Sequence, residues 1–109
     1  MMRPLQIRCA SRWWARARGL IGHPRLCLGQ GLLIHPCRAV HGWGMRYPLD
    51  LAFLDRQAHI LKIDVLKPGG WAVCWTACSV LELAPGSVAY YGWKEGECVA
   101  AFIPSATRS

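Results

Sequence analysis

Acidic residues are absent from the first 46 positions of this chain, although those positions carry eight arginines. The remaining residues hold five basic and six acidic side chains, so the net charge of +7 comes from the first part. A basic surface of this kind can meet phosphate, nucleic acid or an anionic membrane surface. Since no known nucleic-acid-binding motif accompanies it, we do not expect a nucleic-acid partner, and a solvated basic face is the simpler interpretation.

Long hydrophobic runs are also missing. No stretch approaches the roughly 18 apolar residues that indicate a transmembrane helix, and residues 1–4 lead into mixed sequence without the apolar core of a secretory signal. We therefore expect a cytoplasmic protein with no transmembrane segment. Because 53% of its 109 residues are apolar and only 17% are charged, we expect one folded domain over residues 1–109.

None of the six cysteines forms a C-x-x-C pair, the spacing typical of redox and zinc sites. Cys74 and Cys78 come nearest, with three residues between them. Because a secretory signal is absent, we expect reduced and mostly buried thiols rather than three disulfides.

Short apolar runs broken by turn residues predict strands. The expected strands are residues 5–9, 31–34, 39–43, 49–54, 59–65, 80–83 and 97–103. The polar residues 55–58 separate two of these runs, so we predict an antiparallel hairpin over residues 49–65.

Two serines are suited to begin short helices. A helix from Ser11 would reach Leu20, and one or two helical turns from Ser87 would pass through Tyr90 and Tyr91. Six or more short strands with one or two short helices favour a mostly β fold, either a β-sandwich or a partly open barrel.

Two carboxylates stand in apolar strand sequence, where an unpaired charge is costly. Asp50 lies near the start of the run 49–54, and Glu82 lies between two leucines. Arginine is the partner best suited to such a carboxylate, because its fork matches both oxygens. We predict that Arg18 or Arg46 lies within salt-bridge reach of Asp50 or Glu82. The cluster is either structural or part of an anion-binding or acid–base pocket.

Cys37, His41 and Met45 follow one another at intervals of four residues. Thiolate, imidazole and thioether groups together suit a soft metal such as copper, with zinc as the other candidate. Four residues of extended chain span about 13 Å, so these ligands converge only if the chain bends between them. A buried Cys and Met beside a hydrogen-bonded His is the simpler interpretation. Nucleophilic catalysis by Cys37 and His41 lacks a third group to orient the imidazole.

Trp43, Tyr47 and Trp93 are candidates to line a ligand groove with Arg46. Aromatic rings beside one guanidinium suit a planar or anionic small molecule, or a peptide strand. Packing in the core is the alternative. An open sandwich would also leave strand edges that can recruit a partner strand.

Four blocks of sequence carry a family resemblance. They are Arg-Gly-Leu-Ile-Gly at 18–22, Gly-Leu-Leu-Ile at 31–34, the run from His to Asp at 41–55, and the glycine-punctuated segment 81–96. In this order and spacing they resemble the domain of unknown function 192 family over about residues 5–103. Many members have Trp-Met-Lys-Asn-Thr before Pro-Leu-Asp, whereas this chain has Gly-Met-Arg-Tyr there. The resemblance implies a compact β-sandwich-like fold with small helices, and it implies no activity.

These observations favour a non-enzymatic accessory module that binds a small anionic ligand or a protein partner, and they predict no cofactor. Its expected site combines six residues, namely Arg18, Trp43, Met45, Arg46, Asp50 and Glu82. The alternative is a soft-metal protein that uses Cys37, His41 and Met45. A small enzyme comes third, because the sequence shows no set of nucleophile, base and orienting group.

Overall fold

The computed structural model describes residues 2–10 and 26–104, and in that part of the chain it places seven strands in two sheets, one short helix and one 3-10 turn. The strands are β1 (Gln6–Ala10), β2 (Gln30–Ile34), β3 (Ala39–His41), β4 (Leu49–Leu54), β5 (Ile60–Leu66), β6 (Trp71–Val73) and β7 (Ser79–Leu83). The helix is α2 (Ser87–Tyr91) and the 3-10 turn is η1 (Ala100–Phe102). The mostly β fold class expected from the sequence is confirmed.

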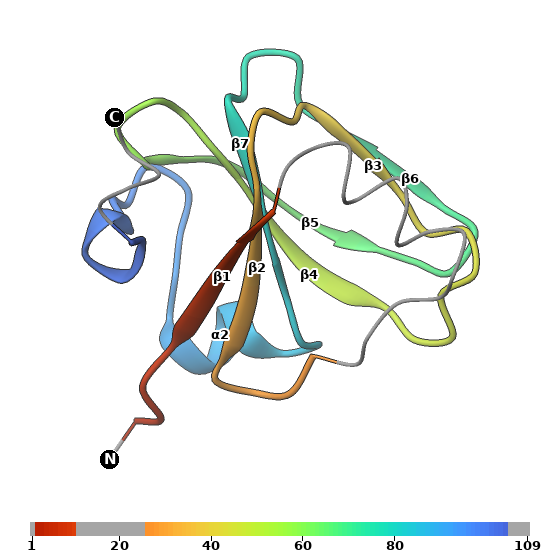
Figure 1. Cartoon of the computed structure of the whole chain (residues 1–109), viewed down its shortest axis with the longest axis horizontal. Coiled ribbons are helices and arrows are strands. Elements are labelled where there is room, and N and C mark those ends of the chain that lie inside the picture. The colour runs from red at the N-terminus through yellow and green to blue at the C-terminus, as the bar shows by residue number, and fades with distance from the viewer. Residues whose placement is uncertain (1, 11–25, 105–109) are drawn as a thin grey trace.

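The larger sheet has the order β1-β2-β7-β4-β5 (Figure 1). Its first two strands run parallel, and the other neighbouring pairs are antiparallel. All of β7 is buried, and in β4 only Asp50 is partly exposed. A strand covered on both faces needs apolar residues at successive positions rather than at alternate ones. This requirement explains the nearly unbroken apolar runs of the two central strands.

The predicted hairpin over residues 49–65 is confirmed, since β4 and β5 pair antiparallel from Leu49 with Leu66 to Leu54 with Ile60. The Asp55 carboxylate holds the connecting turn, because its Oδ1 accepts the backbone N–H groups of Gln57 and His59, both at 2.9 Å. An aspartate that accepts nearby backbone N–H groups is a common way to fix a tight turn.

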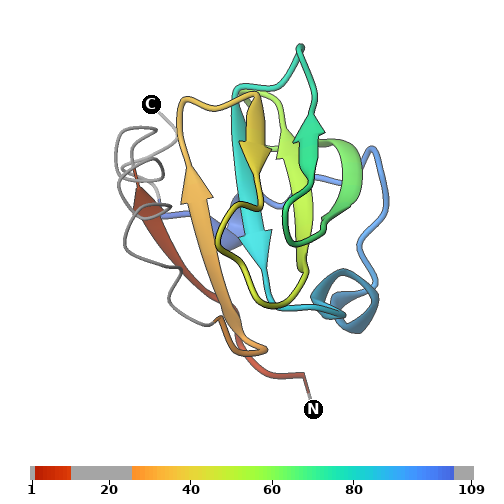
Figure 2. The same ribbon diagram turned by 90° about the vertical axis from the view of Figure 1, so that its right-hand side faces the viewer.

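The smaller sheet, β3 with β6, covers one face of the larger sheet and lies in front of β7 and β4 in Figure 2. Val40 and Ala72 are paired across the two strands, and both are buried in a core with Leu51 and Phe53 of β4. We call this the first core. The sequence did not predict β6, which has only three residues and follows directly on the turn at residues 67–70.

The opposite face of the larger sheet carries a second core. Leu81 and Leu83 of β7 pack there with Trp93, Val99 and Ile103 from the C-terminal segment. The expected strand over residues 97–103 is wrong, because this segment makes one isolated bridge from Cys98 to His59 and then turns into η1. Val99 and Ile103 are buried, but Ala101 between them is exposed, which fits a helical turn and not a strand, where all three would share one face.

The short helix predicted at Ser87 is confirmed as α2, but the expectation that Ser87 caps it is wrong, because Gly86 precedes the helix and the cap residue makes no side-chain hydrogen bond. The helix holds the beginning of the chain, because the Tyr90 hydroxyl accepts the N–H of Arg3 at 2.8 Å and the Tyr91 hydroxyl donates to the Arg3 carbonyl at 3.0 Å. Burial raises the pKa of Tyr91 above its ordinary value, and the neighbouring Tyr90 adds to the shift. The proton that Tyr91 donates is therefore held more firmly than in a free tyrosine.

Two expectations from the sequence concern residues outside those that the structure describes: the helix from Ser11 to Leu20, and the position of Arg18. Within the described residues, no helix has the length and apolar character needed to cross a bilayer.

None of the six cysteines forms a disulfide, as expected. The expectation that most of them are buried is wrong, because only Cys37 is buried and Cys9, Cys27 and Cys98 are exposed. Cys9 lies on the edge strand β1, and Cys27 and Cys98 lie outside the strands. The sequence did not indicate which cysteines are buried, because residues in loops and on edge strands follow no regular pattern of buried and exposed positions.

Candidate binding site

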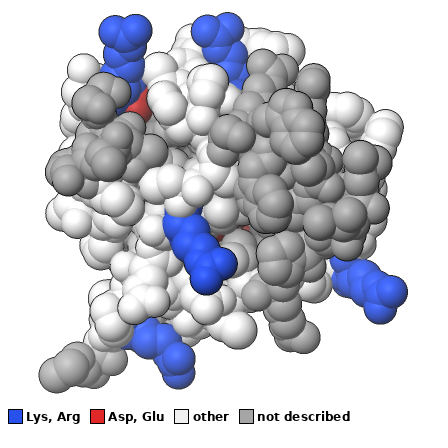
Figure 3. Space-filling view, viewed as in Figure 1, with Lys and Arg blue, Asp and Glu red and all other residues white. Residues whose placement is uncertain are grey.

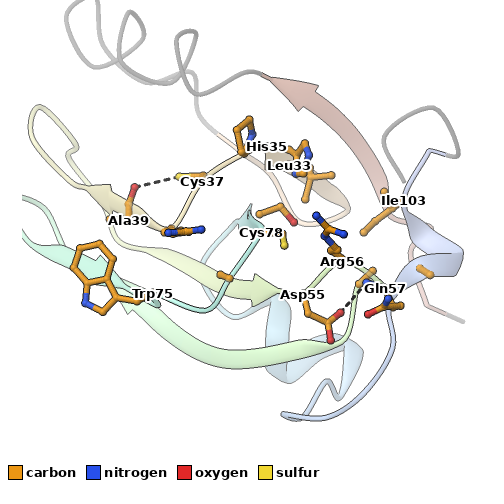
Figure 4. A pocket seen from close by; sticks show the side chains of 16 residues that line it. Leu33, His35, Cys37, Ala39, Asp55, Arg56, Gln57, Trp75, Cys78 and Ile103 are labelled. Carbon is orange, nitrogen blue, oxygen red and sulfur yellow. Dashed lines mark hydrogen bonds between the residues drawn. The ribbon is translucent and has the colours of Figure 1, made fainter. Parts of the chain in front are cut away.

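A hollow of about 1190 Å³ opens at one end of the larger sheet. Strands β2 and β4 end there and β7 begins there, because β7 runs antiparallel to both. Three connecting segments therefore meet at this end, at residues 35–39, 55–58 and 75–79, and the C-terminal 3-10 turn closes the far side. Figure 4 shows the side chains that line it. We call this hollow the end groove.

The end groove carries more positive than negative charge. Its lining includes two exposed arginines, Arg38 before β3 and Arg56 in the β4–β5 turn, and one carboxylate, Asp55. In Figure 4 the Arg56 side chain points into the hollow. Within the described part of the chain, neither guanidinium forms an ion pair with a carboxylate. Asp55 is already used by the turn, and it also lies 3.6 Å from Nδ1 of His59.

Apolar side chains complete the lining of the groove. Leu33, Ala58 and Ile103 are buried residues of the second core that also reach the groove. Trp75 lines it as well, and 72% of this side chain is exposed. The lining is thus divided almost evenly between polar and apolar surface, and small-molecule sites likewise combine apolar walls with polar groups that converge on the ligand.

A second feature is an aromatic cluster on the outer side of the smaller sheet. Val40 and Ala72 point into the first core, so His41 and Trp71, the next residue pair of the two strands, face outward. Trp43 joins them, with its ring centroid 4.9 Å from that of His41 and 5.7 Å from that of Trp71. Trp43 and Trp71 are 56% and 66% exposed. Nδ1 of His41 is buried without a hydrogen-bond partner in the structure.

The two carboxylates expected at one site lie on opposite faces of the larger sheet. Asp50 pairs with Leu83 and Glu82 pairs with Leu51, which places their side chains on different sides. Asp50 is half-buried on the side of the second core, where its Oδ2 accepts the N–H of Val88 at 2.9 Å. Glu82 is 1% exposed on the side of the first core. The structure therefore does not bring these two residues together.

The remaining predicted site residues are also dispersed. Met45 is buried in the first core, whereas Trp43 and Arg46 are exposed. Among the described residues, Arg46 forms no ion pair with Asp50 or Glu82. Trp93 is buried in the second core against Tyr91 and Phe102, so it does not share a groove with Trp43.

The proposed soft-metal ligands do not converge either. Cys37 and Met45 are buried in the first core, and the Cys37 thiol donates to the Ala39 carbonyl at 3.1 Å. His41 faces the other way, against the two tryptophans. Among the described residues, no group of three His, Cys, Asp or Glu side chains is placed to hold a metal ion.

Sequence reasoning missed Arg38, Arg56, Trp71 and Trp75. Arg56 was assigned only to a hairpin turn, and Trp71 belongs to the strand that was not predicted. One available signal was the position of Arg38 and Arg56 in the short segments that follow the apolar strands ending at Ile34 and Leu54, since residues of such loops commonly form the rim of a site.

Comparison with known proteins identifies a family but no activity. Two solved structures share the fold at 21% identity, and each match covers 84% of this chain. One is a protein of unknown function from Novosphingobium aromaticivorans, with a TM-score of 0.68 and 71% of its chain covered. The other, from Sinorhizobium meliloti, is described as a candidate transcription regulator, with a TM-score of 0.70 and 78% of its chain covered.

No curated protein matches the sequence. The family match, in contrast, extends over residues 1–101, which is nearly the whole chain. The protein therefore belongs to the DUF192 family, described as uncharacterized ACR.

Proposed function

We propose that this protein is a non-enzymatic binding module that holds a small organic anion in the end groove. One observation carries the proposal: Arg38 and Arg56, from two different connecting segments, line the same hollow without a carboxylate partner among the described residues. Two guanidinium groups that are not neutralised favour an anionic occupant, since each can bind a carboxylate or phosphate through two parallel hydrogen bonds.

The shape and lining of the groove suggest the rest of the ligand. Its apolar wall, with Leu33, Ala58 and Ile103, suits a hydrocarbon body, and the exposed indole of Trp75 offers a flat surface for a ring. We therefore infer a ligand that carries a carboxylate or phosphate at one end and a planar or apolar group at the other.

Binding without catalysis is favoured by how the groove's reactive groups are engaged. Both hydrogen bonds of Asp55 Oδ1 go to the backbone of its own turn, which suits a structural role better than proton transfer. Between described residues, no cysteine or serine side chain is hydrogen bonded to a histidine. Such a bond is the usual mark of an activated nucleophile. The soft-metal alternative has less support, because His41 points away from Cys37 and Met45.

The proposal is tested with phenyl phosphate as the probe and benzyl alcohol as its neutral counterpart, by ligand-observed NMR in a buffer free of phosphate. We expect the protein to bind phenyl phosphate and not benzyl alcohol. Arg38→Gln and Arg56→Gln should each weaken binding by about tenfold, since a hydrogen bond to a charged group contributes about 1.5–3 kcal/mol.

Arg8→Gln is the matched control, because Arg8 is exposed on β1, does not line the groove, and its loss changes the net charge equally. Equal weakening by Arg8→Gln would show a general charge effect and contradict the proposal. A lack of phenyl phosphate binding by the unmodified protein would contradict it directly.

A further inference from the structure

The outer side of the smaller sheet presents apolar side chains to the surroundings. Of the paired residues of β3 and β6, His41 and Trp71 face outward, and Trp43 packs beside them. Both indoles are more than half exposed, although burial of a tryptophan side chain is strongly favourable. We call His41, Trp43 and Trp71 the aromatic face. The two strands that carry it, β3 and β6, are the nearest to the viewer in Figure 2.

The three rings of the aromatic face hold one another in place. Trp43 and Trp71 meet edge to face at 80°, and the His41 ring lies 4.9 Å from one indole and 5.5 Å from the other. Rings at these distances are in contact, so no slot for a ligand ring is left between them. The cluster is therefore compact. A binding partner can lie against its outer surface but cannot insert between its rings.

The charges around the aromatic face are all of one sign. The two segments that build it, residues 35–48 and 67–76, contain three exposed cations, Arg38, Arg46 and Lys67, and no aspartate or glutamate. Asp64 of the neighbouring strand β5 is balanced by Lys62 at 3.4 Å, and the Lys62 ammonium also donates to the Val73 carbonyl of β6. The two segments that build the aromatic face therefore carry a net positive charge.

We propose that the aromatic face docks the protein on an anionic membrane surface. Indole rings favour the headgroup level of a bilayer, where their apolar body and polar N–H are both accommodated. Each basic residue close to an anionic leaflet adds about 1 kcal/mol of attraction, which corresponds to about fivefold in affinity. A compact cluster of exposed rings can contact a broad lipid surface, because binding to such a surface requires no groove in the protein.

A nucleic-acid strand fits these observations less well. Single strands are bound by basic grooves with separate aromatic platforms for successive bases, whereas these two indoles contact each other. Figure 3 shows another face of the molecule, where the Lys and Arg side chains drawn in blue stand apart from one another. The inference goes beyond the anion-binding function proposed above and does not depend on it.

Vesicle sedimentation tests the inference. The full chain is mixed with vesicles of phosphatidylcholine alone, or of phosphatidylcholine and phosphatidylglycerol in equal parts. We expect binding to the anionic vesicles alone, with a blue shift of the tryptophan emission and a decrease at higher salt. Trp43→Ala combined with Trp71→Ala should abolish the blue shift, and Arg46→Glu combined with Lys67→Glu should weaken binding by at least about tenfold.

Matched controls lie on the other side of the molecule. Phe102→Ala removes an exposed ring and Lys94→Glu reverses an exposed charge beside the second core, and neither should change vesicle binding. Arg56→Gln, which should weaken anion binding in the end groove, should also leave vesicle binding unchanged. The two proposals can therefore fail independently of each other. If the tryptophan variant does not fold, the charge variant decides, since both of its positions are exposed.

Three results would overturn the inference: no binding to anionic vesicles, equal loss with the control variants, or polyuridylate binding that the aromatic variant abolishes while vesicle binding persists.

Discussion

The carboxylate of Asp50 accepts the backbone N–H of Val88 at 2.9 Å and thereby joins the beginning of β4 to the first turn of α2. The first N–H groups of a helix have no partner within the helix, and Gly86, the residue that precedes α2, has no side chain to supply one. Asp50 therefore caps this helix from a strand 38 residues away in the sequence.

Asp50→Ala should lower the free energy of unfolding by about 1–2 kcal/mol, the usual cost of losing a capping side chain. Asp50→Asn should cost less, because the amide oxygen can still accept the N–H of Val88. Urea denaturation of both variants, followed by circular dichroism, provides the measurement. Equal loss in the two variants would show that the charge matters and that the hydrogen bond does not.

Ser87 begins the same helix with a fully buried hydroxyl that has no hydrogen-bond partner among the described residues. A buried polar group without a partner costs about 1–3 kcal/mol. Ser87→Ala should therefore leave the melting temperature unchanged or raise it, unlike most buried substitutions. Ser87→Val, which adds bulk at a position of 0% exposure, should lower it through overpacking. A clear loss of stability in Ser87→Ala would mean that the hydroxyl has a partner.

The sequence predicted the parts of the fold that depend on local pattern. The hairpin β4–β5 was predictable because two apolar runs flank a turn that Asp55 can hold by itself. Helix α2 was predictable because a turn precedes Ser87 and helical contacts are local. By contrast, β6 has three residues and only one of them, Ala72, faces the core, so it shows no alternation long enough to recognise.

The site was less predictable than the fold because its geometry depends on the register between distant strands. The sequence around Asp50 does not reveal that Asp50 pairs with Leu83. This pairing register nevertheless decides that Asp50 and Glu82 lie on opposite faces of the sheet. In the same way, Trp43 and Trp71 meet because His41 pairs with Trp71 across β3 and β6. Both arginines of the end groove lie in connecting segments, whose positions follow from the strands around them.

Glu82 remains the carboxylate for which an arginine partner is predicted. It is 1% exposed, and its cross-strand neighbours are Leu32 and Leu51. We predict that Arg18 is the partner, because Arg46, the other candidate, is exposed and forms no ion pair within the described residues. Arg18→Gln should cost about 3–5 kcal/mol, since it would leave the buried Glu82 carboxylate without its partner, and Glu82→Gln should also lower stability.

A double-mutant cycle over Glu82 and Arg18 tests this pairing by urea denaturation. The double variant should cost clearly less than the sum of the two single variants, because the second change removes a charge that the first left unpaired. Arg46→Gln is the control and should change stability by less than about 0.5 kcal/mol. Additive effects of Glu82→Gln and Arg18→Gln would exclude Arg18 as the partner.

The outer edge of β5 is protected by two carboxylates. Oδ1 of Asp64 accepts the N–H of Val65 at 2.8 Å, and Oε2 of Glu95 lies 3.4 Å from the N–H of Ile63. These two N–H groups belong to alternate residues of an edge strand, so without a partner they would be open to another chain. Leu61 and Val65 of the same strand are exposed, which adds apolar surface to this edge.

The double variant Asp64→Ala with Glu95→Ala should therefore self-associate more than the unmodified protein, with a lower aggregation temperature and larger species in light scattering. This is expected although the change raises the net charge from +7 to +9, because it removes two of the six carboxylates. Asp64→Asn with Glu95→Gln is the matched control, since it alters the charge equally but keeps carbonyl oxygens that can accept the same N–H groups. If both double variants associate equally, charge and not the protected edge keeps the chains apart.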